Sequence, residues 1–484
     1  MFDATKITTA TEMAQAIRDG QTTPGALLEA HLARVDALNE RVNAVIWQDR
    51  DSARALAKTL DDEAARGEFR GPLHGVPMTV KESFDLAGSP STWGIPEWRD
   101  NIADADSDAV SRLRAAGAIV FGKTNVPMKL MEWQSFNEIY GTTNNPWDET
   151  RTPGGSSGGS GAALATGMAA LEVGSDIGSS IRNPAHFNGV FGLKPTWNIV
   201  SLSGHNPPGM AIDTDIAVAG PLARSARDLR LGFDILRGGD PFTKSAWAPH
   251  LPSDDRNDLS QFRVALMLGD PASPVDQAYL DVLSDFADRL AAAGAQVETA
   301  RPDVDSEAHF TLYLQLLGAA MCAGMTEDEV AANLDAVRKL DDPLAWRLYG
   351  NRFGGMNLRH ADWLVLDNQR RLARRAFDAF FHDFDILLSP AASSAAFPHD
   401  QTGPRYARKL NINGQMQPEP MELFWSGYTG VVHVPSVVGP AGFVGHLPVG
   451  YQAAAGHGRD YTALAFAQAV EDALGGYTPP PCVA

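Results

Sequence analysis

Two loops rich in glycine and serine, about one helix-length apart, constrain this chain more than any other feature. The first runs from Gly154 to Ser160, and the second runs from Asp176 to Arg182. Glycine lets a backbone adopt positive φ and approach other groups closely, so serine hydroxyls and amide N–H groups of both loops can point at one small volume. The segment between them, residues 161–170, is small and apolar, which predicts a buried helix with closely packed neighbours.

A lone lysine upstream, Lys81, completes a set of groups suited to acyl transfer. That chemistry requires a nucleophile, a proton carrier, a base and donors for an oxyanion. Taken alone, each feature has a simpler interpretation, because a Gly/Ser-rich loop is more often a linker and a lysine after a strand is usually solvated. The first loop is not a phosphate-binding loop, since no Lys-Ser/Thr pair follows its glycines and it lacks a Gly-x-Gly-x-x-Gly pattern.

The composition argues against several classes of function. The chain has 484 residues and a formal net charge of −19. Phosphate binding requires clustered lysine and arginine, so this balance argues against a nucleic-acid partner and against docking on an anionic membrane. Cys322 and Cys482 are the two cysteines, and they provide neither a disulfide framework nor a metal site. We expect no metal and no cofactor.

The N-terminus indicates a cytoplasmic protein. Residues 1–6 lack the charged and apolar regions of a signal peptide, and no stretch approaches the roughly 20 apolar residues of a membrane span. The expected partner is a small-molecule substrate, and the expected state is a monomer or homodimer.

The periodicity of apolar residues predicts alternating helices and strands. Thr9 and Glu12 form the pattern of a capping box before a helix that Gly20 ends, and Pro24 lies in the first turn of the next helix. Strands are predicted at residues 78–80, 118–122, 263–268, 296–300, 385–388 and 447–451, and further helices at residues 108–115, 274–293 and 460–474. This alternation implies an α/β fold with a large mixed twisted sheet flanked by helices on both faces.

The motifs around the two loops closely resemble those of the amidase signature family. They include Gly75-Val76-Pro77, Gly122-Lys123-Thr124-Asn125, Asn145-Pro146-Trp147, Thr152-Pro153-Gly154-Gly155-Ser156-Ser157-Gly158-Gly159, Ile181-Arg182-Asn183-Pro184-Ala185 and Gly192-Leu193-Lys194-Pro195-Thr196. The resemblance covers essentially the whole sequence. It implies the amidase signature fold as a single domain over residues 1–484, with the catalytic core at residues 60–230. A mostly helical insert at residues 309–381 is our hypothesis for the segment that covers the active site.

The resemblance implies a role for each reactive group. Ser180 would be the nucleophile, Ser156 would follow a cis peptide bond and relay the proton, and Lys81 would be the general base. An exposed lysine has a pKa near about 10.4, so this role requires burial that lowers the pKa. Ser179 is a rival nucleophile, because the family commonly has Gly-Gly-Ser where this chain has Gly-Ser-Ser, although the flanking Asp176 and Arg182 favour Ser180. Ser157 is the runner-up to Ser156 and is otherwise expected to support the site.

The backbone around the second loop would stabilise the oxyanion and hold the nucleophile. The oxyanion hole would be formed by the N–H groups of Ile177, Gly178 and Ser179, together with that of Ser180. Asp176 and Arg182 flank the turn and are expected to brace it as a charge pair; the alternative is a partly exposed surface pair that contributes little.

Two segments are expected to line the substrate pocket. Leu130, Met131, Trp133 and Gln134 correspond to the part of the family that lines the acyl pocket, and Phe424 and Trp425 would form a second wall. The alternative for that second wall is ordinary core packing. Aromatic walls with few charges suit a neutral, partly apolar amide or carbamate.

The sequence therefore predicts an amidase for small neutral aryl or alkyl amides, with esters and carbamates such as urethanes as further substrates. The alternative is the glutamine-hydrolysing subunit of a tRNA-dependent amidotransferase, which has the same fold. The acidic composition and the aromatic candidate pocket argue against that alternative. Retention of Lys81, Ser156 and Ser180 together argues against a non-catalytic relative.

Overall fold

The computed structural model describes residues 3, 6 and 8–483. Residues 1, 2, 4, 5, 7 and 484 lie outside this part, and so does most of the N-terminal stretch on which the expected localisation rests. No helix in the described part combines the length and the apolar character that crossing a bilayer requires.

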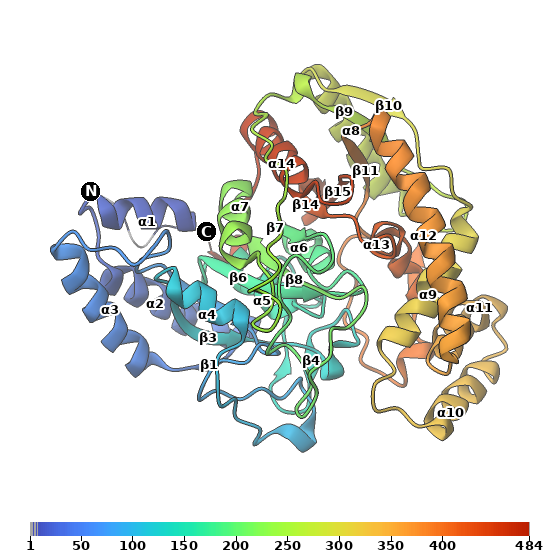
Figure 1. Ribbon diagram of the computed structural model, residues 1–484, viewed down its shortest axis with the longest axis horizontal. Coiled ribbons are helices and arrows are strands. Elements are labelled where there is room, and N and C mark those ends of the chain that lie inside the picture. The colour runs from blue at the N-terminus through green and yellow to red at the C-terminus, as the bar shows by residue number, and fades with distance from the viewer. Residues whose placement is uncertain (1–2, 4–5, 7, 484) are drawn as a thin grey trace.

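A large mixed sheet occupies the centre of the molecule (Figure 1). Within the described residues it has eight strands in the order β10-β9-β11-β15-β14-β7-β8-β6. Strand β9 is parallel to β10 and β11, and the remaining neighbours are antiparallel. The strands are β6 (Leu171–Asp176), β7 (Phe191–Lys194), β8 (Val218–Ala223), β9 (Arg263–Leu266), β10 (Gln296–Thr299), β11 (Ile386–Pro390), β14 (Ser436–Val444) and β15 (Leu447–Ala454). The predicted mixed sheet is confirmed.

The strand that carries Lys81 belongs to a second, three-stranded sheet of order β1-β3-β2, which the sequence did not predict. Its strands are β1 (Val45–Gln48), β2 (Pro77–Lys81) and β3 (Ile119–Thr124). Strand β2 lies beside the edge strand β6 of the large sheet, because the Ala170 N–H donates to the Pro77 carbonyl at 3.2 Å. The Thr79 hydroxyl also donates to the Glu172 carboxylate on β6. These contacts bring the lysine strand next to the strand that leads into the second glycine loop.

Helices cover both faces of the large sheet. On β15, Tyr451 stacks on Phe286 of α8, whereas the neighbouring Gln452 accepts a hydrogen bond from Arg182 of α6 on the opposite face. The helices are α1 (Ala10–Arg18), α2 (Pro24–Val42), α3 (Arg50–Ala65), α4 (Asp108–Ala115), α5 (Gly158–Ala165), α6 (Arg182–Asn188), α7 (Ala226–Leu236), α8 (Gln277–Ala292), α9 (Ser306–Ala320), α10 (Glu327–Arg338), α11 (Pro343–Gly355), α12 (His360–Asp383), α13 (Leu423–Gly430) and α14 (Asp460–Leu474). Two short strand pairs, β4 (Phe136–Asn137) with β5 (Gly141–Thr142) and β12 (Lys409–Ile412) with β13 (Gln415–Pro418), lie outside the sheets.

Most predicted elements are present, with shifted ends. The capping box of Thr9 and Glu12 forms at the start of α1, and α14 has the predicted bounds. Helix α5 covers Gly158–Ala165 rather than residues 161–170, because Gly167 takes a positive φ of 70° just after the helix. Left-handed backbone of this kind commonly ends a helix, and glycine adopts it without strain. Helix α5 is fully buried, as predicted.

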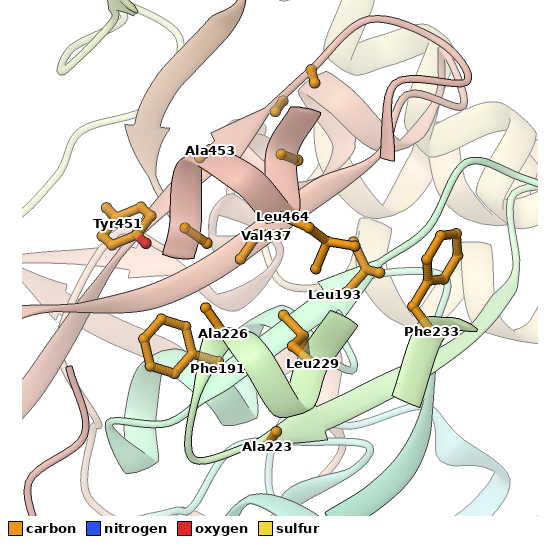
Figure 2. Packing of buried hydrophobic residues seen from close by; sticks show 14 of the residues in the cluster. Phe191, Leu193, Ala223, Ala226, Leu229, Phe233, Val437, Tyr451, Ala453 and Leu464 are labelled. Carbon is orange, nitrogen blue, oxygen red and sulfur yellow. The ribbon is translucent and has the colours of Figure 1, made fainter. Parts of the chain in front are cut away.

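One part of the main core lies between the large sheet and helices α7 and α14 (Figure 2). Its labelled side chains are Phe191, Leu193, Ala223, Ala226, Leu229, Phe233, Val437, Tyr451, Ala453 and Leu464. All are buried, and burial of apolar surface contributes about 25 cal/mol per Å². This packing fixes the strands that carry the site.

Helices α9, α10, α11 and α12 gather at one side of the molecule, where α9 packs against α13 (Figure 1). The mostly helical character predicted for residues 309–381 is confirmed, although α9 begins earlier, at Ser306, and α12 ends later, at Asp383. The domain boundaries proposed from the sequence stay predictions.

Candidate active site

Lys81 lies at the end of β2 with no solvent exposure. Its Nζ donates to the Ser156 Oγ at 2.7 Å and to the Ser175 Oγ at 2.8 Å. All five residues of β2 are buried, so the strand delivers the amine into the interior rather than to solvent. The lysine and Ser156, which are 75 positions apart in the chain, are therefore in direct contact.

Burial changes the protonation of this amine. Desolvation lowers the Lys81 pKa from 10.5 to about 7, although Asp176, Glu82 and Glu172 act in the opposite direction. The charged form loses its hydration in the interior, and no carboxylate is close enough to replace it fully. A large fraction of Lys81 is therefore neutral near pH 7 and has a lone pair that can accept a proton.

Ser156 and Ser157 have different surroundings. The Gly155–Ser156 peptide bond is cis, and the Ser156 Oγ accepts the hydrogen bond from Lys81. The Ser157 Oγ instead lies 3.4 Å from the backbone oxygen of Ser175. The Ser157 N–H donates to the Ser180 carbonyl at 3.2 Å, which ties the two loops together.

Gly155 is required for a close approach. A Cβ at this position would lie 2.4 Å from the Glu132 carbonyl and 3.0 Å from the Trp133 Cα. Only glycine lets the loop pack against this backbone. The serine loop is thus held directly against the segment expected to line the acyl pocket.

A buried ion pair braces the second loop. Asp176, at the end of β6, accepts from the Arg182 Nη2 at 2.9 Å and from the Arg182 Nε at 3.0 Å, and neither side chain is exposed. The carboxylate also accepts from the N–H groups of Ser179 and Ile181. Burial acts to raise the Asp176 pKa, but Arg182 outweighs it and holds the pKa below the usual value. The expected charge pair is present, and it is buried rather than a surface pair.

Arg182 also ties the loop to the C-terminal part of the chain. Its Nη1 donates to the Ser426 carbonyl, the Thr429 Oγ1 and the Gln452 Oε1 at 2.9 to 3.1 Å. Since breaking a buried pair leaves an uncompensated charge, the loop and these segments are strongly coupled.

The turn gives Ser179 and Ser180 different positions. Ser179 has a φ of 75°, its N–H donates to the Asp176 Oδ1 at 3.0 Å, and its hydroxyl is buried without a partner. Ser180 borders the pocket described below, together with Ile177 and Gly178. The structure departs here from the expected oxyanion hole, because the Ser179 N–H is already used by Asp176.

A pocket opens in front of Ser180, with an empty volume of about 300 Å³ that includes its mouth. Three of the expected residues line it, namely Leu130, Met131 and Trp133. The Trp133 Nε1 donates to the Gly178 carbonyl at 2.8 Å and so connects the pocket wall to the second loop. The remaining lining residues are Glu132, Ile177, Gly178, Leu317, Met321, Arg352, Arg405 and Leu423.

Three other expected pocket residues do not line this cavity. Gln134 is buried, and its side-chain amide bonds to the backbone of Asp400 in both directions. Phe424 and Trp425 are buried in the main core, where Phe424 packs edge-on against Phe310. Successive residues of a helix point about 100° apart, so α13 turns Leu423 toward the pocket and the next two side chains into the core. Phe424 and Trp425 are therefore core residues, as the alternative interpretation expected, and they do not form a wall of this pocket.

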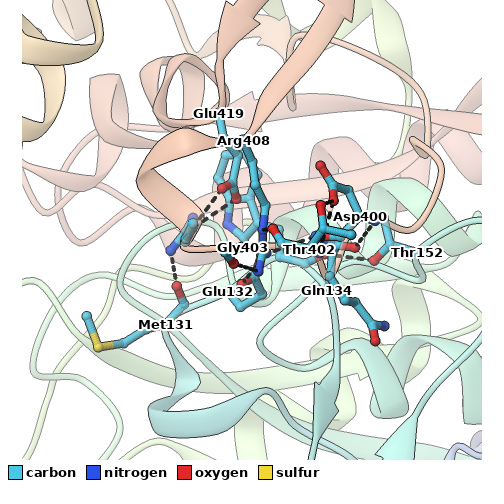
Figure 3. Close-up of polar contacts among 12 residues, drawn as sticks. Met131, Glu132, Gln134, Thr152, Asp400, Thr402, Gly403, Arg408 and Glu419 are labelled. Carbon is cyan, nitrogen blue, oxygen red and sulfur yellow. Dashed lines mark hydrogen bonds and ion pairs between the residues drawn. The ribbon is translucent and has the colours of Figure 1, made fainter. Parts of the chain in front are cut away.

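Salt bridges hold the wall of the pocket (Figure 3). The Glu132 carboxylate accepts from the Arg408 Nη1 at 2.8 Å. Arg405 donates to the Glu419 carboxylate at 2.9 Å and to the Met131 carbonyl. Both arginines follow the long loop after β11, so the C-terminal part of the chain fixes the conformation of the wall.

Sequence reasoning missed several residues around the site. Ser175 precedes Asp176 on β6, and only its position next to the braced turn could have indicated it. Leu317 and Met321 come from α9 and its end, and Arg352 comes from α11. The sequence shows many arginines between residues 309 and 381, but nothing in it distinguishes the one that reaches the pocket.

A protein-family model matches nearly the whole chain. The family model described as "Amidase" matches residues 26–464. An indoleacetamide hydrolase of Bradyrhizobium diazoefficiens is 32% identical over 96% of this chain and 86% of its own length. A glutamyl-tRNA(Gln) amidotransferase subunit of Salinispora tropica is 30% identical over 99% of this chain and 100% of its own length.

The fold agrees with that match. A solved bacterial aryl acylamidase of the amidase signature enzymes superposes with a TM-score of 0.81, covering 98% of this chain and 97% of the other. Its sequence identity of 23% supports a shared fold only.

Proposed function

Because the chain belongs to the amidase signature family of amide hydrolases, we propose that it cleaves small amides through an acyl intermediate on Ser180. Lys81 is the general base in this proposal, and Ser156 carries the proton between them. The proposal is most directly supported by one observation. A fully buried Lys81, with its pKa lowered to about 7, donates to the Ser156 Oγ at 2.7 Å.

The reaction divides into two half-reactions. Neutral Lys81 takes the Ser156 hydroxyl proton as Ser156 takes that of Ser180, and the Ser180 oxygen attacks the carbonyl carbon. The C–N bond then breaks, and the relayed proton leaves with the amine. Water attacks the acyl-serine with the same relay, which releases the acid and restores Ser180.

The oxyanion needs donors that are not otherwise engaged. We assign this role to the N–H groups of Ile177, Gly178 and Ser180, three residues that border the pocket. The Ser179 N–H is excluded because it donates to Asp176. Losing one such donor typically costs about 2.7–4 kcal/mol in the transition state.

The pocket supports an aryl or alkyl acyl group. Most of its wall is apolar, contributed by Leu130, Met131, Trp133, Leu317, Met321 and Leu423. Such walls bind hydrocarbon surface, while a few polar groups orient the ligand. Esters and carbamates, including urethanes, pass through the same tetrahedral intermediate and are proposed as secondary substrates.

The helical segment at residues 309–381 is proposed to set substrate specificity. Leu317, Met321 and Arg352 all come from this segment and line the pocket. None of the three proposed catalytic residues comes from it.

Covalent labelling and turnover test the function. The purified chain should hydrolyse a p-nitroanilide, and a fluorophosphonate probe should label Ser180. Ser180→Ala should abolish both, whereas Ser179→Ala should still be labelled. Labelling that persists in Ser180→Ala and disappears in Ser179→Ala would assign the nucleophile to the other serine.

A second function is favoured by the similarity to amidotransferase subunits. The relative from Salinispora tropica, which aligns over nearly all of this chain, belongs to an amidotransferase. In that case the chain would release ammonia from glutamine and require partner subunits. We expect the purified chain alone to hydrolyse anilides and to leave glutamine intact; ammonia release that appears only with partner subunits would favour the second function.

A further inference from the structure

Arg352 is a buried arginine in the pocket wall that lacks an acidic partner. It lies on α11, is 4% exposed, and lines the same pocket as Ser180. Among the described residues it forms no ion pair, and its Nε is buried without a hydrogen-bond partner. Its Nη2 lies 3.8 Å from the Met321 Sδ, which is a weak acceptor.

The neighbouring arginines differ from Arg352 in this respect. Arg405 donates to Glu419, and Arg408 donates to Glu132. Each of these carboxylates is used by its own arginine, so neither is left to neutralise Arg352. The pocket and its wall therefore carry one uncompensated positive charge.

The other groups near Arg352 do not remove this charge. Burial, with Arg405 acting in the same direction, lowers the Arg352 pKa to about 10, while Tyr349, Tyr313 and Glu419 act in the opposite direction. The guanidinium therefore stays protonated at neutral pH. A buried charge without a partner is costly, so an anion that enters the pocket is bound strongly.

We propose that Arg352 binds a carboxylate on the acyl group of the substrate, so that the preferred amides have an acyl chain ending in a carboxylate. This rests on the proposed hydrolysis at Ser180 and refines the neutral substrates that the sequence predicted. A guanidinium presents parallel N–H donors that match a carboxylate. One negative charge balances the single uncompensated positive charge, whereas a phosphate dianion would exceed it.

The same wall argues against a zwitterion such as glutamine. An ammonium group in the pocket would need a free acceptor of opposite charge, and the one carboxylate among the pocket-lining residues of the described chain is Glu132. That carboxylate already accepts from Arg408 and from the Gln134 side chain. An acyl chain with a carboxylate and no ammonium therefore fits these groups better.

A series of paired substrates tests the proposal. The acyl chains are malonyl, succinyl, glutaryl and adipyl p-nitroanilides, each compared with the unsubstituted acyl anilide of equal carbon number. For at least one length, kcat/KM for the charged member should exceed that of its neutral partner by about tenfold or more. A wild-type preference for the neutral member at every length would overturn the proposal.

Variants of Arg352 assign the preference to this side chain. Arg352→Gln should lower the charged-to-neutral ratio by about tenfold, mainly through KM for the charged member. Arg352→Lys should retain part of the ratio, because the charge is kept and the fork is lost. The matched control is Arg347→Gln on the same helix, an arginine that pairs with Glu307 outside the pocket. A ratio in Arg352→Gln equal to that of the wild type would overturn the proposal.

Binding without turnover separates this inference from the proposed function. Calorimetry with malonate, succinate, glutarate and adipate should show binding to the wild type by at least one of them, and about tenfold weaker binding to Arg352→Gln. Absence of anilide hydrolysis together with such binding would contradict the amidase proposal and retain the anion site. Hydrolysis of neutral anilides without any dicarboxylate binding would retain the amidase proposal and overturn the anion site.

Discussion

The two sides of the pocket are built in different ways. On one side, Lys81, Ser156 and Ser180 are held by buried strands and glycine-containing turns whose backbones are in contact. On the other side, long side chains make the wall, and salt bridges between distant segments such as Arg405 and Glu419 hold it. The first construction rests on backbone contacts between buried loops, whereas the second rests on side chains that substitutions can change one at a time. Under the proposed function, chemistry and substrate choice are therefore carried by separate parts of the chain.

The largest expected effect lies on the catalytic side. Lys81→Met should lower kcat by about 10³-fold or more, because no base remains to accept the relayed proton. The stability should change little, because a side chain of similar length replaces a buried amine that carries a desolvation penalty. Steady-state hydrolysis of a p-nitroanilide and thermal unfolding measure the two quantities. Retention of more than a tenth of the activity would contradict the role of this lysine.

Removal of the Asp176–Arg182 ion pair, which braces the second loop, should give the next largest effect, on the free energy of unfolding. Asp176→Asn should lower the free energy of unfolding by about 3–5 kcal/mol, because Arg182 is left buried without its counter-charge. The control is Asp362→Asn on α12, which removes the partner of Arg359, an arginine that is 81% exposed. An exposed pair is worth roughly 0–1 kcal/mol. Equal losses in denaturant unfolding of the two variants would contradict the bracing role of the buried Asp176–Arg182 pair.

The pH profile gives a smaller effect that reports on the catalytic side alone. The Lys81 pKa is lowered to about 7, and the proposed mechanism requires the neutral form. The value of kcat/KM should therefore rise about tenfold per pH unit below 7 and level off above it. Between pH 7 and the unfolded value near 10.5, the folded state binds fewer protons, so this group makes stability rise with pH.

A second buried group titrates close to the same range and supplies the control. Burial raises the pKa of Glu172 to about 8, and this carboxyl accepts from Thr79 on the lysine strand. The rise in kcat/KM should persist in Glu172→Gln. If the rise disappears in that variant, the profile belongs to Glu172 and not to Lys81.

The difference between the two sides of the pocket also explains what could be predicted from the sequence. Lys81, Ser156 and Ser180 belong to local motifs of glycine, proline and serine, and such motifs specify backbone turns within a few residues. Buried strands and capped helices such as α1 are likewise local patterns. The fold was therefore predictable from the sequence, and the same motifs pointed to the three residues whose catalytic roles are proposed above.

The rest of the site depends on which side chains meet across the fold. Arg352 and Met321 reach the pocket because α9 and α11 pack together, and no local pattern marks either residue. Phe424 and Trp425 have the composition of a pocket wall, yet the rotation of α13 buries them in the core. The use of the Ser179 N–H by Asp176 also follows from turn geometry that the sequence does not specify.

The smallest expected effect lies on the side of the pocket that α9 and α11 line. Met321→Ala shortens a pocket-lining side chain, so it should shift kcat/KM toward bulkier acyl groups by roughly fivefold to tenfold relative to acetyl. A series of p-nitroanilides with acetyl, butyryl and phenylacetyl groups measures the shift. Met416→Ala, at a position 58% exposed and outside the pocket, should give the wild-type order. The pH profile of Met321→Ala should keep its midpoint near 7, because the surroundings of Lys81 are unaltered. A displaced midpoint would mean that the helical wall and the proton relay are coupled, and the separation of chemistry from substrate choice would then fail at this contact.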